Sequence, residues 1–291
     1  MGPWLKFACL LVFAVAISVG LATLASAGGP QVFGVPALTA CALLAFAVNL
    51  IAFIPASVAQ TERYYDITGT LTYLSVVGLA LWSARHALAW RAVVVAIMVT
   101  VWAARLGLYL FARVRRDGKD GRFDEIKRSW PRFGIAWTLQ GLWVFLTSFA
   151  ATVIITTSRP AEALTWLDVV GGATWFVGMV IEVVADRQKK VFRADPANAG
   201  RFIQTGLWAW SRHPNYVGEI TLWFGVAVMG VSTFEGARWL GFVSPVFVYL
   251  LLTRVSGVPM LEARADLRWA SDPDYQRYKV RTPVLWPRPP R

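Results

Sequence analysis

Residues 7–61 read FACLLVFAVAISVGLATLASAGGPQVFGVPALTACALLAFAVNLIAFIPASVAQT, and none of these 55 side chains is charged. A run of this length can form two membrane-spanning helices of about 20 residues each. The Gly28-Gly29-Pro30 sequence interrupts the run and predicts a tight external hairpin between the two helices. The stretch therefore predicts a membrane protein.

The composition of the whole chain supports this prediction. Of the 291 residues, 56% are hydrophobic and 16% are charged, whereas soluble domains carry about 25% charged residues. The predicted fold is an all-α, polytopic bundle that forms one domain over 1–291. We expect about eight spans, with seven as the alternative, because 220–234 and 239–253 are uncharged over only 15 residues each. The predicted spans are 7–27, 34–57, 68–84, 91–112, 134–157, 164–185, 217–234 and 239–255.

The N-terminal run has a second interpretation. Ala25-Ser26-Ala27 resembles a signal-peptidase site. However, Lys6 is the only charged residue before a long apolar stretch, and this favours a retained span.

The positive charge is concentrated in three polar segments. The net charge is +12, and 22 of the 29 basic residues lie in 113–132, 187–212 and 254–291. By the positive-inside rule, these segments and both termini are cytoplasmic. Anionic membrane lipids, not nucleic acid, are the expected partners of this charge. Arginine outnumbers lysine 23 to 6, which suggests a bacterial genome and hence the inner membrane, and we expect a monomer.

No metal site is expected. Cys9 and Cys41 lie in apolar runs and are interpreted as buried hydrophobic residues. The chain contains only two histidines, His86 and His213, so a site built on several histidines is excluded.

Polar residues are densest in 182–223. Glu182 and Asp186 lie four residues apart at the end of a predicted span, and therefore share a helix face. Ionisable groups at membrane depth usually face a cavity or a partner.

A second polar group, Arg212 and His213, precedes Pro214, which can start a helix. A helix N-terminus attracts anions, so a phosphate or carboxylate is expected there. Asn215, Tyr216 and Glu219 occupy the first turns of this helix, where a ribose or amide could bind. The alternative is a capped, amphipathic helix start with an interfacial Tyr and Trp.

These residues resemble a known family. The run from Asp186 to Glu219, above all RHPNYVGE at 212–219, resembles the C-terminal domain of the steroid 5-alpha-reductase family, especially its bacterial membrane branch. The resemblance covers 60–290. Its other motifs are QTERYYDITG at 60–69, WAARL at 102–106, GKDGRF at 118–123, and Pro259-x-x-Glu262 through Tyr275-x-x-Tyr278. Isoprenylcysteine carboxyl methyltransferases, which bind S-adenosylmethionine, share the Arg-His-Pro-x-Tyr element.

The resemblance implies NADPH-dependent reduction of a carbon–carbon double bond conjugated to a carbonyl. It places the cofactor in a cytoplasm-open cavity of the C-terminal part, 182–291, and brings a lipophilic substrate from the bilayer. Arginines suit the phosphates of NADPH because a guanidinium binds them in a bidentate manner. The residues implied to contact the cofactor are Arg105, Asp186, Arg193, Arg212, His213, Asn215, Tyr216, Glu219, Arg254, Glu262 and Tyr275. For Glu262, Tyr275 and Tyr278 the alternative is a tail that docks on the lipid surface.

The catalytic residues implied by the resemblance lie in the 60–66 loop. Family reductases place a Gln-Glu pair and a Tyr at the substrate carbonyl. This chain has Thr61 inserted between Gln60 and Glu62, and Trp102 at the position of the Tyr, which weakens the case for a steroid substrate. We expect Tyr64, Tyr65 or Asp66 of the same loop to substitute, and a membrane-shielded Glu62 to have a raised pKa and donate a proton. The alternative for this loop is an interfacial segment with an aromatic anchor and a helix cap.

Two further functions compete with a reductase. The first is an S-adenosylmethionine-dependent methyltransferase acting on a lipid or prenyl thiol carboxylate. The second is a non-enzymatic membrane partner of a redox enzyme. S-adenosylmethionine carries a sulfonium and no phosphate, so the arginines at 105, 193, 212 and 254 favour NADPH.

Overall fold

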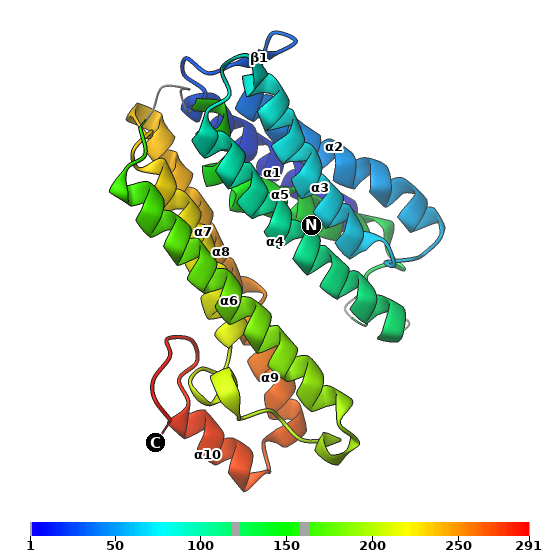
Figure 1. The fold of residues 1–291 in the computed structure, drawn as a ribbon. Helices are drawn as coiled ribbons and strands as arrows, with labels where there is room; N and C mark the ends of the chain where they lie inside the picture. The colour runs from blue at the N-terminus through cyan, green and yellow to red at the C-terminus, as the bar shows by residue number, and fades with distance from the viewer. Residues whose placement is uncertain (1, 118–120, 122, 158–162, 291) are drawn as a thin grey trace. The chain divides into compact units, whose positions relative to one another are not determined.

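The computed structural model describes residues 2–117, 121, 123–157 and 163–290, and these are almost entirely helical (Figure 1). The chain divides into two compact units. Unit 1 comprises Met1–Leu164 and Gly230–Val243, and unit 2 comprises Thr165–Met229 and Ser244–Arg291.

Within its described residues, unit 1 contains five long helices and a short β-hairpin. The elements are α1 (Pro3–Ala25), β1 (Gln31–Val32), β2 (Val35–Pro36), α2 (Ala37–Val58), α3 (Tyr65–Ala84), η1 (Arg85–Ala87), α4 (Trp90–Asp117), α5 (Trp130–Thr157) and the 3₁₀ helix η4 (Gly236–Phe242).

The turn between α1 and α2 is a two-stranded hairpin. Val32 pairs with Val35 in an antiparallel register. Phe33 and Gly34 form the two-residue loop and have φ values of 51° and 80°. Two successive positive φ values are typical of the type I′ turn, whose twist matches that of paired strands. The predicted turn is therefore present, but its tip lies after the Gly28-Gly29-Pro30 break.

Helix α5 is the core of unit 1. It contacts α1, α2, α3 and α4, and most of its side chains are buried. Several of its buried Ser and Thr residues tolerate burial because their hydroxyl groups donate to backbone carbonyls about one turn earlier. For example, Ser148 Oγ lies 2.7 Å from the Val144 oxygen, and Thr156 Oγ1 lies 2.8 Å from the Thr152 oxygen. Satisfied hydroxyl groups of this kind avoid the large cost of burying an unpaired polar atom.

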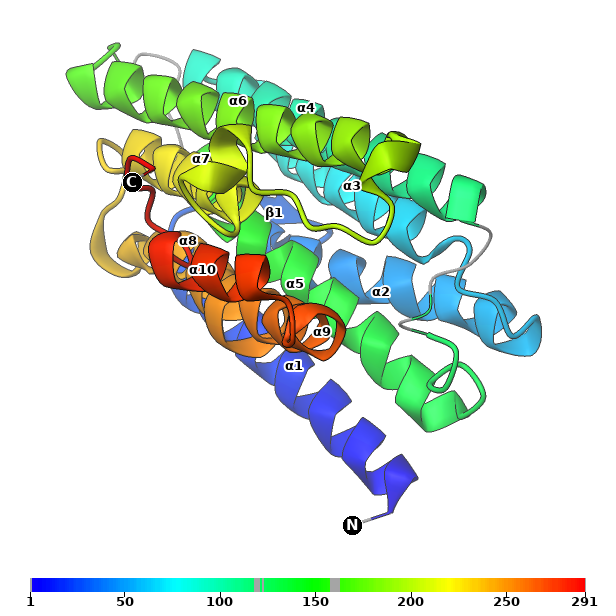
Figure 2. The same cartoon turned by 90° about the horizontal axis from the view of Figure 1, so that it is seen from below.

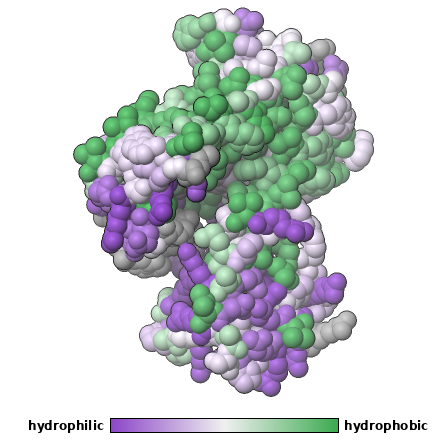
Figure 3. Space-filling view, turned by 180° about the vertical axis from the view of Figure 1, so that it is seen from behind, coloured by the Kyte–Doolittle hydropathy of each residue, from purple (hydrophilic) through white to green (hydrophobic). Residues whose placement is uncertain are grey.

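Unit 2 contains two packed helices, α6 and α7, and several shorter elements. Hydrophilic side chains gather over the part that contains α9 and α10 (Figure 3). The elements are α6 (Trp166–Ala194), η2 (Pro196–Asn198), η3 (Gly206–Ala209), α7 (Pro214–Gly230), α8 (Val243–Leu250), the π-helix η5 (Leu251–Val255), α9 (Val258–Trp269) and α10 (Pro273–Arg281).

Four glycines bring α6 and α7 into backbone contact, and the two helices lie side by side in Figures 1 and 2. A Cβ atom at Gly171 would lie 2.6 Å from the Gly225 oxygen, and one at Gly178 would lie 2.5 Å from the Leu222 nitrogen. A Cβ atom at Gly218 would lie 2.6 Å from the Gly178 oxygen. Small residues are the usual device for close helix packing in membranes.

Seven helical segments are long and apolar enough to cross a membrane, among the residues that the structure describes. They match the predicted spans except 217–234, which corresponds to the 17 residues of α7. The predicted span 239–255 is part of a longer, bent stretch, Gly236–Trp269, built from η4, α8, η5 and α9. The polytopic, helical prediction is confirmed, with seven spans by length and composition. The cytoplasmic placement of the termini stays a prediction.

Candidate functional site: a basic, aromatic cavity

Unit 2 contains a cavity of about 300 Å³ with a strongly positive lining. Among the described residues that line it, Glu262 is the single acid. The cations are Lys189, Arg193, Arg201, Arg212, Arg264 and Arg268. An excess of cations in a partly enclosed space raises the local concentration of anions, so the cavity suits an anionic ligand.

Helical spacing brings these cations together. Lys189 and Arg193 lie four residues apart on the last turns of α6, and Arg264 and Arg268 lie four apart on α9. Residues at this spacing share a helix face. Arg212 immediately precedes His213 and α7. The cavity therefore receives its charge from α6, from α9 and from the segment that leads into α7.

Aromatic side chains form the rest of the lining. Phe202 packs against the rings of Trp269, Tyr275 and Tyr278 at centroid distances of 5.7, 5.3 and 5.5 Å. Trp208 donates from Nε1 to the Ala185 oxygen at 3.1 Å. The Lys189 ammonium group lies 4.3 Å from the centroid of the Trp208 ring. Aromatic faces beside cations suit a ligand that carries both a planar base and phosphates.

The two tyrosines of α10 are held as hydrogen-bond donors. Tyr275 Oη donates to Asp266 Oδ1 at 3.0 Å, and Tyr278 Oη donates to the Trp208 oxygen at 2.7 Å. Burial raises the pKa of both phenols, and for Tyr275 the bond to Asp266 raises it further. Both hydroxyl groups therefore keep their protons at neutral pH.

Glu262 connects the two residues that precede α7. Arg212 NH1 donates to Glu262 Oε2 at 2.6 Å, and His213 Nε2 lies 2.8 Å from Glu262 Oε1. Burial lowers the pKa of His213, although the Glu262 carboxylate opposes this shift. The His213 ring also stacks on the Tyr216 ring at a centroid distance of 5.4 Å.

The C-terminal segment is hydrogen-bonded to the residues before α7. The Arg212 N–H donates to the Pro283 oxygen at 2.9 Å, and the Arg288 N–H donates to the Trp210 oxygen at 3.0 Å. Ser211 Oγ donates to the Val284 oxygen at 3.4 Å. Residues 283–288 thus fix the conformation of 210–212 beside the cavity.

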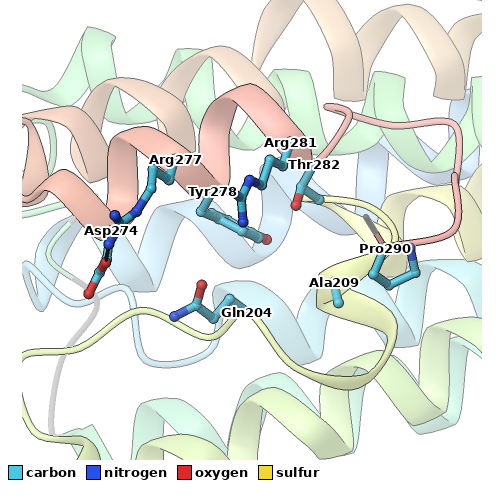
Figure 4. Close-up of a pocket in the computed structure, with 8 residues that line it drawn as sticks. All are labelled: Gln204, Ala209, Asp274, Arg277, Tyr278, Arg281, Thr282 and Pro290. Atoms are coloured by element: carbon cyan, nitrogen blue, oxygen red, sulfur yellow. Dashed lines mark hydrogen bonds and ion pairs between the residues drawn. The ribbon is translucent and has the colours of Figure 1, made fainter.

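A second cavity, of about 380 Å³, is lined by Asp274, Arg277, Tyr278 and Arg281 of α10 (Figure 4). Tyr278 lines both cavities. In this second cavity Arg277 is paired with Asp274, and Gln204 lies on the opposite side. The smaller cavity has the larger unbalanced charge, and it is therefore the stronger candidate site.

The predicted cofactor residues are only partly gathered at the basic cavity. Those that line it are Arg193, Arg212, His213, Glu262 and Tyr275. The others in unit 2 are Asp186 on α6, Asn215, Tyr216 and Glu219 in the first turns of α7, and the exposed Arg254 in η5. Arg105 belongs to α4 of unit 1, where its guanidinium lies 5.9 Å from the centroid of the Tyr109 ring.

Several lining residues were not predicted from the sequence as site residues. They are Lys189, Phe192, Arg201, Phe202, Trp208, Arg264, Arg268 and Trp269. The four-residue spacing within the pairs 189/193 and 264/268 is the signal that could have identified their cations. No comparable signal marks Phe202 or Trp208, because their place depends on how the 200–213 segment folds.

The predicted catalytic residues lie together at the start of α3 in unit 1. Gln60 is exposed, has a φ of 49° and donates from Nε2 to the Ser57 oxygen at 2.8 Å. Tyr65 Oη donates to the Ala136 oxygen at 3.0 Å, and Asp66 lies in the first turn of α3. Trp102 is fully buried and packs against Tyr73 at a centroid distance of 5.2 Å.

Glu62 is buried and forms an ion pair, since Lys127 Nζ lies 2.7 Å from its Oε2 atom. Lys127 belongs to the 113–132 segment, one of the three basic segments that the sequence predicts to be cytoplasmic. Phe123 of the same segment is packed in a core cluster with Phe53, Phe133 and Trp137. The GKDGRF motif precedes Lys127, and its residues 118–120 and 122 lie outside the described residues.

Replacing Lys127 by Ala should destabilise the protein by about 1–2 kcal/mol, because the buried Glu62 carboxylate would lose its charged partner. Thermal unfolding in detergent measures this change. Combining Lys127→Ala with Glu62→Gln should recover part of the loss. A single variant as stable as the parent would show that the pair contributes nothing.

Comparison with known proteins identifies one family, whose function is not described. Residues 52–282 match the family model "Protein of unknown function (DUF1295)". "Uncharacterized protein C594.04c" of Schizosaccharomyces pombe is 25% identical over 186 residues, which cover 53% of this chain and 54% of that protein. The match thus spans about half the length of this relative. No solved structure matches the chain.

Proposed function

The chain belongs to the DUF1295 family, and from this premise we propose that it is a membrane-embedded, NADPH-dependent reductase of a lipophilic enone. The proposal combines the resemblance to steroid 5-alpha-reductases with the chemistry of the basic cavity. We further propose a bacterial inner membrane as its location.

One observation carries the proposal: among the described residues, six cations, several aromatic rings and a single acid line the cavity. NADPH presents the matching groups, namely a diphosphate, a 2′-phosphate and two planar rings. A volume of about 300 Å³ is at the lower end of ligand sites, so we propose that the cavity holds one part of the dinucleotide. The sulfonium of S-adenosylmethionine would be repelled by the same cations.

The proposed chemistry divides between two groups of residues. Arg193, Arg201, Arg264 and Arg268 would bind phosphates, and the rings of Phe202 and Trp208 would flank a base. When bound, NADPH would supply a hydride to the β-carbon of the enone.

The α-carbon then needs a proton, and the carbonyl needs hydrogen-bond donors to stabilise its developing negative charge. We propose Gln60, Glu62, Tyr65 and Asp66 for these roles. The Lys127 ammonium group is a proton-bearing neighbour of Glu62.

Titration of the purified protein in detergent with NADPH, NADH and S-adenosylmethionine tests the proposal. We expect NADPH to bind at least about tenfold more tightly than NADH, because a 2′-phosphate adds a charge-assisted hydrogen bond. Oxidation of bound NADPH on addition of enones, from steroids to prenyl and fatty enals, would then identify the substrate class.

The alternatives give different results in the same titration. Binding of S-adenosylmethionine alone would identify a methyltransferase and overturn the reductase proposal. Failure of all three ligands to bind would favour a non-enzymatic membrane protein.

A further inference from the structure

We infer that His213 determines ligand specificity as a hydrogen-bond acceptor: its Nδ1 atom accepts from a hydroxyl group or an amide N–H of the bound nucleotide. Glu262 is the positioning residue that holds the His213 ring in the tautomer required. This inference rests on the proposed nucleotide-binding function and assigns one ligand contact within it.

The contact with Glu262 determines which ring nitrogen carries the proton. His213 Nε2 lies 2.8 Å from Glu262 Oε1, and a carboxylate can only accept. The other carboxylate oxygen, Oε2, accepts from Arg212 NH1 at 2.6 Å, which favours the charged form of Glu262. The proton of a neutral His213 therefore lies on Nε2, and Nδ1 has a free lone pair.

The surroundings of His213 favour this neutral form. Besides Glu262 of α9, the charged groups that act on the ring are Lys189 of α6 and the adjacent Arg212. Both are cations, so both oppose protonation of His213 to the imidazolium. The Tyr216 ring of α7 covers one face of the imidazole. Burial lowers the pKa of His213, which favours the neutral ring at neutral pH.

The Nδ1 atom of His213 is an unsatisfied acceptor on a residue that lines the basic cavity. The residue lines the basic cavity and is only 5% exposed. Nδ1 is buried and accepts no hydrogen bond from any residue that the structure describes. An unsatisfied, buried acceptor is unfavourable, and a donor group on a ligand in the cavity would remove this cost.

Nitrogen NMR of protein labelled with ¹⁵N-histidine in detergent tests the tautomer directly. The chain has only two histidines, His86 and His213, so His86→Gln assigns the remaining signals. At pH 7.5 and without ligand, we expect a protonated Nε2 and an unprotonated Nδ1. Glu262→Gln should allow the other tautomer, because an amide can donate to Nε2 as well as accept from it.

The ligand contact is tested by adding NADPH, adenosine 2′,5′-bisphosphate or reduced nicotinamide mononucleotide. We expect NADPH to shift the Nδ1 resonance, and the fragment that reproduces this shift identifies the half of the dinucleotide that donates. Two results would overturn the inference about His213 but not the proposed function. One is an Nδ1–H tautomer without ligand, and the other is NADPH binding with an unchanged Nδ1 resonance. Absence of NADPH binding would instead remove the proposed function.

Two substitutions separate the ring nitrogens of His213. Asn places its acceptor near the position of Nδ1, whereas Gln can maintain the bond that Nε2 makes to Glu262. We expect His213→Asn to stay within about threefold of the parent affinity for NADPH and His213→Gln to lose about tenfold. If His213 only supported the fold through its bond to Glu262, His213→Gln would bind NADPH more tightly than His213→Asn.

Discussion

Replacing Gly171 by Ala is expected to lower the thermal stability of the protein by about 5–10 °C. The added methyl carbon would lie 2.6 Å from both the Gly225 oxygen and Met229 Cγ, so α6 and α7 would have to separate. Overpacking of this kind costs about 1–3 kcal/mol, and we expect the upper end because a backbone atom cannot move aside. For a chain of this size, each kcal/mol corresponds to about 2–4 °C.

The neighbouring residue provides the matched control. Gly172 lies on the same turn of α6, and a Cβ atom there meets nothing within 4 Å. Gly172→Ala should therefore be neutral, or stabilising by up to about 1 kcal/mol, since Ala is the better helix former. Equal melting temperatures for the two variants in detergent would contradict the close packing of α6 and α7.

Removing two cations of the basic cavity together, in Arg193→Ala/Arg268→Ala, should weaken NADPH binding by at least about 100-fold. Each guanidinium is expected to make a charge-assisted hydrogen bond worth about 1.5–3 kcal/mol, and 1.4 kcal/mol corresponds to a factor of ten. Both residues are exposed at the rim of the cavity, so the fold should be unaffected. Calorimetric titration measures the change.

The control for this prediction removes the same amount of charge from positions outside the cavity. Arg187 and Lys190 are exposed on α6 but do not line the cavity. The Arg187→Ala/Lys190→Ala variant should bind NADPH within about threefold of the parent. Equal losses in the two double variants would indicate a general effect of net charge and would exclude a specific phosphate site.

The apolar runs predicted the membrane helices well, because each span must satisfy its own backbone hydrogen bonds and must be continuous. Prediction was weakest where the chain bends, in the 217–255 region. There, α7 is short, and η4 and η5 are 3₁₀ and π segments. Periodicity alone cannot show where a helix changes its hydrogen-bond pattern.

Contacts between distant residues were the part of the site that could not be predicted. Lys127 and Glu62 are separated by 65 positions, and the Glu262 carboxylate meets His213 across 49. A single sequence carries no record of such pairings. The motif at 212–219 did identify Arg212 and His213 as site residues. A local motif shows which polar side chains lie close together in the sequence, although it does not show which distant residues they contact.

The hydrogen bonds between 283–288 and 210–212 have an evolutionary consequence. Backbone atoms make most of these bonds, so the bonds depend less on the side chains of 283–288 than on the length of that segment. An insertion in 283–288 would shift Pro283 relative to Arg212 and displace the arginine from the cavity. Selection on ligand binding would therefore act on a C-terminal segment that has no residue in the basic cavity.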